Sequence, residues 1–219
     1  YEDISQLDDK KVFDKCNDDI TSTLVAVSRV YKQTILGVSN EDRKQLKSAC
    51  NETEDVANRI RYQKNNVHLT VRQLQADSID TGHFYVQELD YLKEIINSLK
   101  HIARPSYDHI LNNHRGLEEM QARELMTINT DVRELYKNIL RMITEHKYNE
   151  LDVIVDEQQR LLEKIQNLRK KQLKRIKNNQ ATSTKNNLLY LDILSETKNI
   201  ILLKFRRCLL IDNQDINLI

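Results

Sequence analysis

The sequence predicts an all-α protein with six long helices, arranged as two pseudo-symmetric three-helix bundles. The chain of 219 residues contains only 3 glycines and 1 proline, so few residues interrupt a helix. Elsewhere, apolar side chains recur at the 3- and 4-residue spacing of a helix face. Gly37, Gly82 and Gly116 are expected at helix ends, because glycine adopts the left-handed conformation without steric cost.

Residues 1–116 are expected to form the first unit, which contains three helices. The first helix covers residues 9–36, where apolar residues gather on one face. The second is expected to begin at Ser39, an N-cap residue with Asp42 three positions later, which is a variant of the capping box. This second helix is expected to continue to about residue 79.

Two features modify the helices of this first unit. Asn65 and Asn66 predict an irregularity in the second helix. The third helix starts after Gly82 and contains Pro105. Because a proline removes one helical hydrogen bond and clashes with the preceding turn, we expect a kink near Ala103 rather than a helix end.

Residues 117–219 are expected to form the second unit, with helices over 118–145, 150–177 and 184–211. The first of these carries apolar residues at an unbroken 3-4-3-4-3 spacing, which is typical of a bundle helix. These residues are Leu125, Ile128, Val132, Leu135, Ile139 and Met142. The helix over 184–211 is apolar on nearly every side, so it is expected to be the most buried.

The two units also share a local pattern, which favours a duplicated three-helix unit. Residues 89–92 and 188–191 both have the form L-x-Y-L and lie in the third helix of their unit. The duplicated units are expected to pack as two bundles, or to share their third helices in a common core.

Composition excludes several classes of function. The net charge is +1, so no general attraction to nucleic acid is expected. No segment has about 18 consecutive apolar residues, so none is expected to cross a membrane. Cys16, Cys50 and Cys208 match no metal-binding spacing, which indicates reduced thiols in the cytosol. The chain begins at Tyr1 rather than Met, so we expect it to be part of a longer polypeptide.

No catalytic motif is recognisable, which predicts that the protein is not an enzyme. The sequence has no glycine-rich phosphate loop, nucleophile elbow, H-E-x-x-H or C-x-x-C motif. His109 and His114 flank Asn112 and Asn113. This group is interpreted either as a polar binding patch or as exposed polar residues at a helix end.

The third helix of each unit carries one polar stripe, in which polar residues recur three or four positions apart and so share a helix face. Their residues are Asp90, Glu94, Asn97 and His101 in the first unit, and Asp192, Glu196 and Asn199 in the second. Oxygen and imidazole ligands at this spacing bind a divalent metal when two helices combine them. The alternative interpretation is a solvated polar face.

A cluster of six cations ends the helix over 150–177. They are Arg169, Lys170, Lys171, Lys174, Arg175 and Lys177. Cations at this position complement the helix dipole. They are also suited to contact anionic lipid headgroups, whereas the absence of interleaved aromatic residues disfavours nucleic-acid binding.

Six segments of the chain match a known protein family in order and spacing, over nearly the whole chain. They are residues 82–87, 89–92, 104–117, 169–178, 189–191 and 196–199. Together they resemble the C-terminal cytoplasmic region of bacterial sodium/phosphate cotransporters of the NptA type, which is PhoU-like. The resemblance implies a regulatory module of phosphate uptake at the cytoplasmic face of the inner membrane. Its implied partner is a transmembrane transporter domain upstream in the same polypeptide. The basic cluster adds the anionic membrane surface as an expected partner. Pairing with a second copy of the chain stays open.

The chain is also similar to PhoU itself, but it departs from PhoU at the metal-binding motif. In PhoU proteins this motif is E-x-x-x-D, and it follows a Tyr-Leu pair in each repeat. In the first half the matching positions hold Lys93 and Asn97, so this metal site is expected to be lost. In the second half they hold Asp192 and Glu196, so one weak divalent metal is the only cofactor expected.

Two other functions are alternatives to a transporter module. One is a free-standing helical adaptor that binds partners through its bundle faces. The other is a bundle metalloenzyme, which two Glu-x-x-His motifs would favour; the sequence contains neither, so this reading ranks last.

Overall fold

The computed structural model describes residues 9–72, 79–180 and 183–202, and these residues form helices and short connections without a β-strand. The all-α prediction is therefore confirmed. A six-residue helix, α3 (Val67–Arg72), and a 3₁₀ turn, η1 (Tyr148–Glu150), accompany six long helices. The long helices are α1 (Asp9–Ser39), α2 (Arg43–Asn65), α4 (Ile79–Leu111), α5 (Glu119–Thr144), α6 (Leu151–Lys177) and α7 (Thr184–Ile201).

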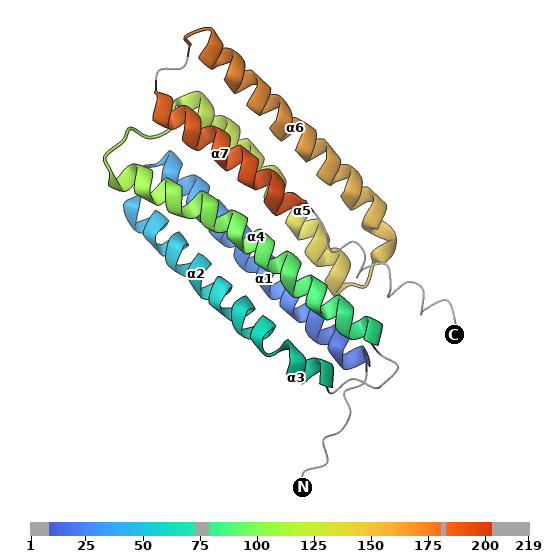
Figure 1. Ribbon diagram of the computed structural model, residues 1–219. Coiled ribbons are helices and arrows are strands. Elements are labelled where there is room, and N and C mark those ends of the chain that lie inside the picture. The colour runs from blue at the N-terminus through green and yellow to red at the C-terminus, as the bar shows by residue number, and fades with distance from the viewer. Residues whose placement is uncertain (1–8, 73–78, 181–182, 203–219) are drawn as a thin grey trace.

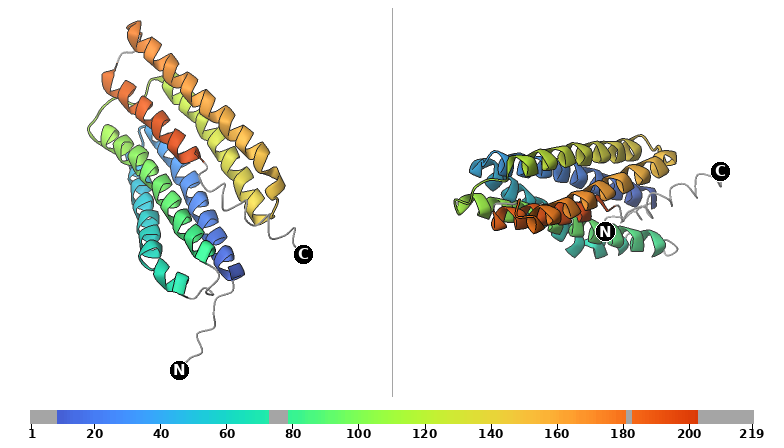
Figure 2. Two further views of the ribbon diagram at one scale, coloured as in Figure 1. Left: turned by 45° about the vertical axis from the view of Figure 1, so that its right-hand side comes forward. Right: turned by 90° about the horizontal axis from the view of Figure 1, so that it is seen from above.

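The long helices lie side by side along one axis, which gives the molecule an elongated shape (Figures 1 and 2). In the first half, α1, α2 and α4 each pack against the other two. In the second half, α6 packs against both α5 and α7. The halves meet where α4 packs on α7 and α1 packs on α5, and one continuous apolar core runs through both. A superposition of residues 1–116 on 117–219 stays a prediction.

Hydrogen bonds from buried side chains fix the end of α7 to the other helices. The Tyr136 hydroxyl of α5 donates to the backbone oxygen of Ile200 at 2.8 Å, and the Gln158 amide of α6 donates to that of Ile201 at 2.9 Å. Nine of the 18 residues of α7 are buried. The predicted extension of this helix to residue 211 lies outside the described residues, as does Cys208.

The glycines do not end helices in the way that the sequence predicted. Gly37 and Gly82 lie inside α1 and α4, and none of the three glycines has a positive φ. At Gly37 the reason is close packing, because a Cβ atom there would lie 2.8 Å from Cγ of Leu46 in α2. Gly116 does lie between α4 and α5, and its N–H donates to Oε1 of Glu41 at 2.9 Å.

Four other residues take the left-handed conformation at helix ends: Glu41, Asn113, His146 and Asn179, with φ between 53° and 57°. Each is followed by a residue whose N–H returns to a carbonyl five positions earlier, as in His114 to His109 at 3.2 Å. This is the Schellman motif, which satisfies the last carbonyls of a helix.

Some predicted helix boundaries are confirmed and others are corrected. The N-cap of α2 is Asp42, whose side chain accepts from the Gln45 N–H at 3.0 Å, and not Ser39, which ends α1. The irregularity is confirmed, because α2 ends at Asn65 and the short helix α3 begins at Val67. The prediction of one helix continuing to residue 79 is therefore wrong. Helix α4 begins at Ile79 rather than after Gly82. Helix α4 continues unbroken past Pro105, as predicted, while the kink stays a prediction.

Among the described helices, none is long and apolar enough to span a membrane.

Candidate functional site

The two predicted polar stripes meet in a shallow groove between α4 and α7, at the junction of the two halves. The groove has a volume of about 430 Å³ and is lined by Glu94, Asn97, Ser98, His101, Glu196, Asn199 and Leu202. Residues three or four apart share a helix face, which explains why each helix contributes such a set. The structure thus brings together side chains that lie about 100 residues apart in the sequence.

Glu196 is the central acceptor of this groove. Its Oε1 lies 3.7 Å from Nδ1 of His101, and its Oε2 accepts from the Asn199 amide at 3.3 Å. The Glu196 side chain is 23% exposed, whereas that of His101 is 69% exposed. The imidazole therefore lies at the rim, where it is open to solvent.

Two residues of the stripes are absent from the groove lining. Asp90 forms an ion pair with Lys64 of α2, and Asp192 is exposed on α7. Across the ranges that the structure describes, no three or more His, Cys, Asp or Glu side chains are grouped to hold a metal ion. Glu196 and Asp192 thus stay a predicted ligand pair, and Lys93 and Asn97 lie exposed on α4.

The basic end of α6 is divided between the interior and the surface. Arg175 is only 7% exposed, and its guanidinium donates to both carboxylate oxygens of Glu124 in α5, at 2.6 and 2.9 Å. Lys171 also reaches Glu124, at 3.1 Å, from an exposed position. The remaining four cations are exposed, and they are Arg169, Lys170, Lys174 and Lys177. Contact with a membrane stays a prediction for this surface.

Glu124 is the centre of a polar network that joins α5, α6 and α7. The Tyr190 hydroxyl of α7 donates to Glu124 Oε2 at 2.6 Å. Burial raises the pKa of Glu124, but hydrogen bonds from Arg175, Tyr190 and Lys171 outweigh it and lower the pKa to about 2. The carboxylate is therefore ionised at neutral pH and holds three helices together.

Buried amides continue this network toward the loop that joins the two halves. The Asn187 Oδ1 accepts from Gln121 at 3.2 Å and from Gln172 at 2.9 Å, and the Asn186 amide donates to the Gly116 carbonyl. No sequence motif predicted this network. The sequence nevertheless contains a sign of it, because Gln121 lies one helical turn before Leu125 and therefore occupies a core position.

The histidine group near the end of α4 stabilises a loop. His109 is buried, and its Nε2 lies 2.8 Å from the Arg115 carbonyl oxygen. The half-buried His114 has its Nε2 2.9 Å from Nζ of Lys185, and burial, Lys185 and His109 together lower its pKa. Asn113 takes the left-handed conformation that ends α4. These contacts give the group a structural role.

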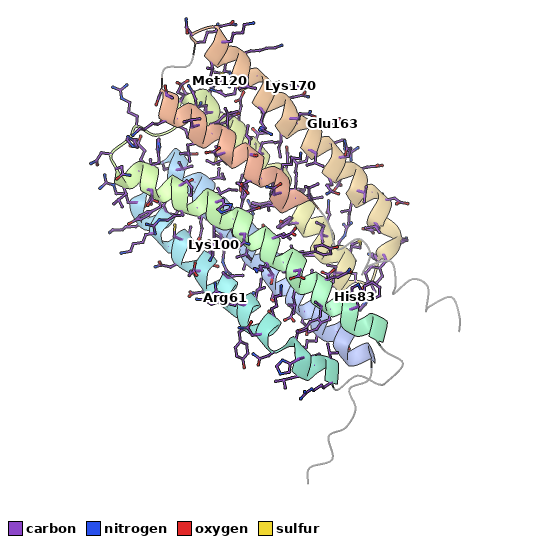
Figure 3. The ribbon with its side chains drawn as sticks, viewed as in Figure 1. Arg61, His83, Lys100, Met120, Glu163 and Lys170 are labelled. Carbon is purple, nitrogen blue, oxygen red and sulfur yellow. The ribbon has the colours of Figure 1, made fainter. Side chains whose placement is uncertain are left out.

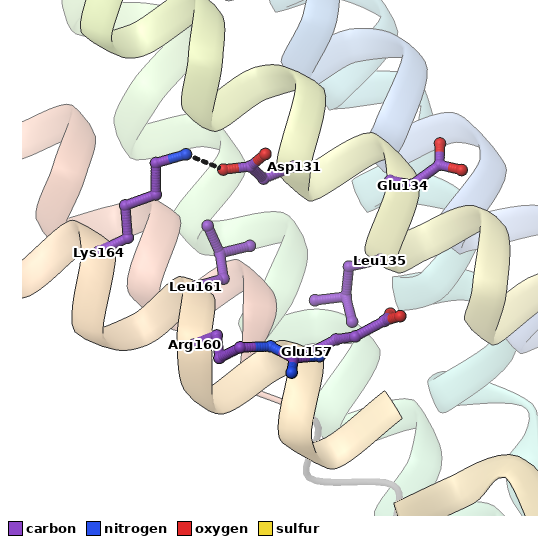
Figure 4. Close-up of a pocket in the computed structure, with 7 residues that line it drawn as sticks. All are labelled: Asp131, Glu134, Leu135, Glu157, Arg160, Leu161 and Lys164. Atoms are coloured by element: carbon purple, nitrogen blue, oxygen red, sulfur yellow. Dashed lines mark hydrogen bonds and ion pairs between the residues drawn. The ribbon is translucent and has the colours of Figure 1, made fainter. Parts of the chain in front are cut away.

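A second groove lies between α5 and α6 (Figure 4). Its floor consists of Leu135 and Leu161, and its rim carries both signs of charge, including an ion pair between Lys164 and Asp131. Because the rim carries both acidic and basic groups, this groove favours no one class of ligand.

Comparison with known proteins identifies the fold class. No family model and no curated protein sequence matches the chain. Among solved structures, the chain is similar to the phosphate transport system regulatory protein PhoU from Streptococcus pneumoniae, with a TM-score of 0.71. The match covers 92% of this chain and 93% of that protein, at 12% sequence identity. The chain thus has a PhoU-like helical-bundle fold, as predicted.

Proposed function

We propose that this chain is a regulatory, non-catalytic domain that controls phosphate uptake. The observation that carries the proposal is the similarity to PhoU over nearly the full length of both chains. That protein is named as a regulator of a phosphate transport system. A match that extends over both halves, rather than over one helical hairpin, supports the same kind of module.

The more specific form of the proposal is a module attached to a sodium-dependent phosphate cotransporter. In this form the chain follows a transmembrane domain of the same polypeptide, at the cytoplasmic face of a bacterial inner membrane. The support is the sequence resemblance of the segments 82–117 and 169–199 to such cotransporters. The exposed cations at the end of α6 suit a position beside anionic headgroups.

The coding sequence upstream of Tyr1 provides the first test of the attached form. Several spans of about 20 apolar residues are expected there. If the upstream sequence encodes no such span, the chain is not a transporter module, and the free-standing adaptor becomes the better reading.

An uptake experiment tests the regulatory role. Cells that lack their own phosphate transporters would express the intact polypeptide, or the same polypeptide truncated before Tyr1, and uptake of radiolabelled phosphate would be followed with and without sodium. The truncated form is expected to keep sodium-dependent uptake but to lose its response to external phosphate. Identical responses from the two forms would overturn the proposed function.

A further inference from the structure

A narrow cleft between α2 and α4 is distinct from the groove at the junction of the halves. Its volume is about 220 Å³. The side chains of Ile60 and Ile96, each 1% exposed, form its apolar floor. The remaining lining residues are Ala57, Arg61, Lys64, Asn65, Lys93, Asn97 and Lys100.

Every ionisable side chain that lines this cleft is a cation. Arg61 and Lys64 come from α2, and Lys93 and Lys100 come from α4; Figure 3 shows Arg61 and Lys100 on these neighbouring helices. The two cations of each helix lie three or seven residues apart, and this spacing places them on the face that is turned toward the other helix. No carboxylate belongs to the lining.

Two ion pairs between α2 and α4 lie at the two ends of the cleft. Lys64 pairs with Asp90, and Lys100 Nζ lies 2.7 Å from Glu54 Oε2. Because Glu54 and Lys64 lie ten residues apart on α2, these pairs are separated by nearly three helical turns. They hold the two helices together and leave the middle of the cleft to Arg61 and Lys93.

The charges in the middle of the cleft are only partly balanced by neighbouring residues, because Lys100 and, more weakly, Arg61 lower the pKa of Glu54, but Arg61 forms no direct ion pair with it. Arg61 donates to the neutral Asn58 Oδ1 at 2.8 Å, and neither Arg61 nor Lys93 forms an ion pair with another residue in the described ranges. The four lining cations and the two pairing carboxylates leave a net charge of +2. Arg61 and Lys93 are both exposed, so this excess positive charge is accessible to anions from solvent, and salt screens its attraction for them.

We propose that this cleft binds a phosphate group, with Arg61 and Lys93 as its principal ligands. The guanidinium presents a planar set of donors that matches a phosphate, and the ammonium adds a compact charge. The Asn97 amide supplies a neutral donor on the same wall. A cleft of about 220 Å³ is smaller than the roughly 300–1,000 Å³ usual for drug-sized ligands, which favours a small anion.

This inference stands on the geometry of α2 and α4 and does not depend on the proposed attachment to a transporter. A phosphate group reaches the cleft either as free inorganic phosphate or as a lipid headgroup. The chemistry of recognition is the same, and the source is separated by experiment.

Calorimetric titration of the full chain with inorganic phosphate at low salt tests the site. Binding is expected in the unmodified chain and is expected to weaken at least about tenfold in the double variant Arg61→Gln, Lys93→Gln. The control is Lys47→Gln, which removes an exposed charge from the same helix away from the cleft and should leave binding unchanged. Circular dichroism melting would verify that the variants remain folded.

A parallel arm uses vesicles that contain phosphatidylglycerol and identifies the source of the phosphate group. Binding to vesicles alone, weakened in the double variant but not in Lys47→Gln, supports the site with a lipid headgroup as its ligand. Binding of inorganic phosphate that survives in the double variant, or no binding of either probe to the unmodified chain, overturns the proposal.

Discussion

The hydroxyl oxygen of Tyr31 in α1 lies 2.9 Å from Oγ1 of Thr197 in α7, and both residues are completely buried. Thr197 Oγ1 donates its only hydrogen to the Ile193 carbonyl oxygen at 2.6 Å. Tyr31 must therefore be the donor to Thr197. Burial raises the pKa of Tyr31, so it keeps the proton that this bond needs. One hydrogen bond thus connects the first and the last described helix.

Removing this hydroxyl is expected to destabilise the bundle modestly. The substitution Tyr31→Phe should lower the free energy of unfolding by about 1 kcal/mol, because one buried hydrogen bond is lost while the ring still fills its space. Chemical denaturation measures the change. Tyr62→Phe, at a side chain 70% exposed, is the matched control and should have no effect. Equal stability of the two variants would contradict a structural role for the bond.

Acid should weaken the fold through Glu124. Its pKa of about 2 in the folded chain lies below the ordinary value of 4.5, so folding favours the ionised form. The stabilisation is fully present above about pH 4.5 and is lost as the pH falls toward 2. Denaturation measured across this range should show a steep loss of stability.

The variant Glu124→Gln isolates the contribution of this carboxylate. It should lower the free energy of unfolding by about 2–3 kcal/mol at neutral pH, because buried Arg175 loses its charged partner. It should also make the free energy of unfolding depend less steeply on pH between about 4.5 and 2. Glu119→Gln changes an exposed carboxylate on the same helix and should leave both unchanged. If the free energy of unfolding of Glu124→Gln falls with decreasing pH as steeply as that of the unmodified chain, Glu124 is not the cause of the acid sensitivity.

Divalent metal is expected to bind weakly, and only through Asp192 and Glu196. Two carboxylates are few for a hard cation that prefers six or more oxygen ligands. Titration with Mn²⁺ should therefore give at most one weak site, which the double variant Asp192→Asn, Glu196→Gln removes. The pair Asp14 and Asp18, exposed at the same spacing on α1, provides the control. Two or more tightly bound metals per chain by elemental analysis would refute this prediction.

The exposed end of α6 is expected to bind anionic membranes at low salt. Each cation near such a surface contributes about 1 kcal/mol, and salt screens the effect. Neutralising the four outward cations with glutamine should strongly weaken co-sedimentation with anionic vesicles; they are Arg169, Lys170, Lys174 and Lys177. Arg175 is left intact, because its loss would destabilise the fold.

A charge-matched control separates a specific surface from general attraction. It replaces four exposed cations elsewhere with glutamine, namely Lys32, Lys44, Lys47 and Arg59. This variant should bind vesicles like the unmodified chain. If both variants lose binding equally, the end of α6 is not the membrane-facing surface.

Helical periodicity was sufficient to predict the all-α class and the long helices from the sequence. The apolar residues from Leu125 to Met142 repeat every three or four positions, and all six are buried, because this spacing places them on one face of a helix. The two polar stripes of the groove followed from the same rule. A repeat of this kind depends only on local backbone geometry, so it can be derived without knowing the neighbouring helices.

Only the tertiary structure decided which faces meet. Gly37 is needed because Leu46 of another helix approaches it, and Arg175, which the sequence placed in a surface cluster, turns inward to Glu124. Asp90 does not line the groove with the rest of its stripe but pairs with Lys64, and Lys93 lines a cleft with Arg61. Each of these outcomes depends on a partner helix from a distant part of the chain. The sequence alone therefore determined the helices and their polar faces, whereas the packing of one helix against another decided which charges are paired, buried or free to bind a ligand.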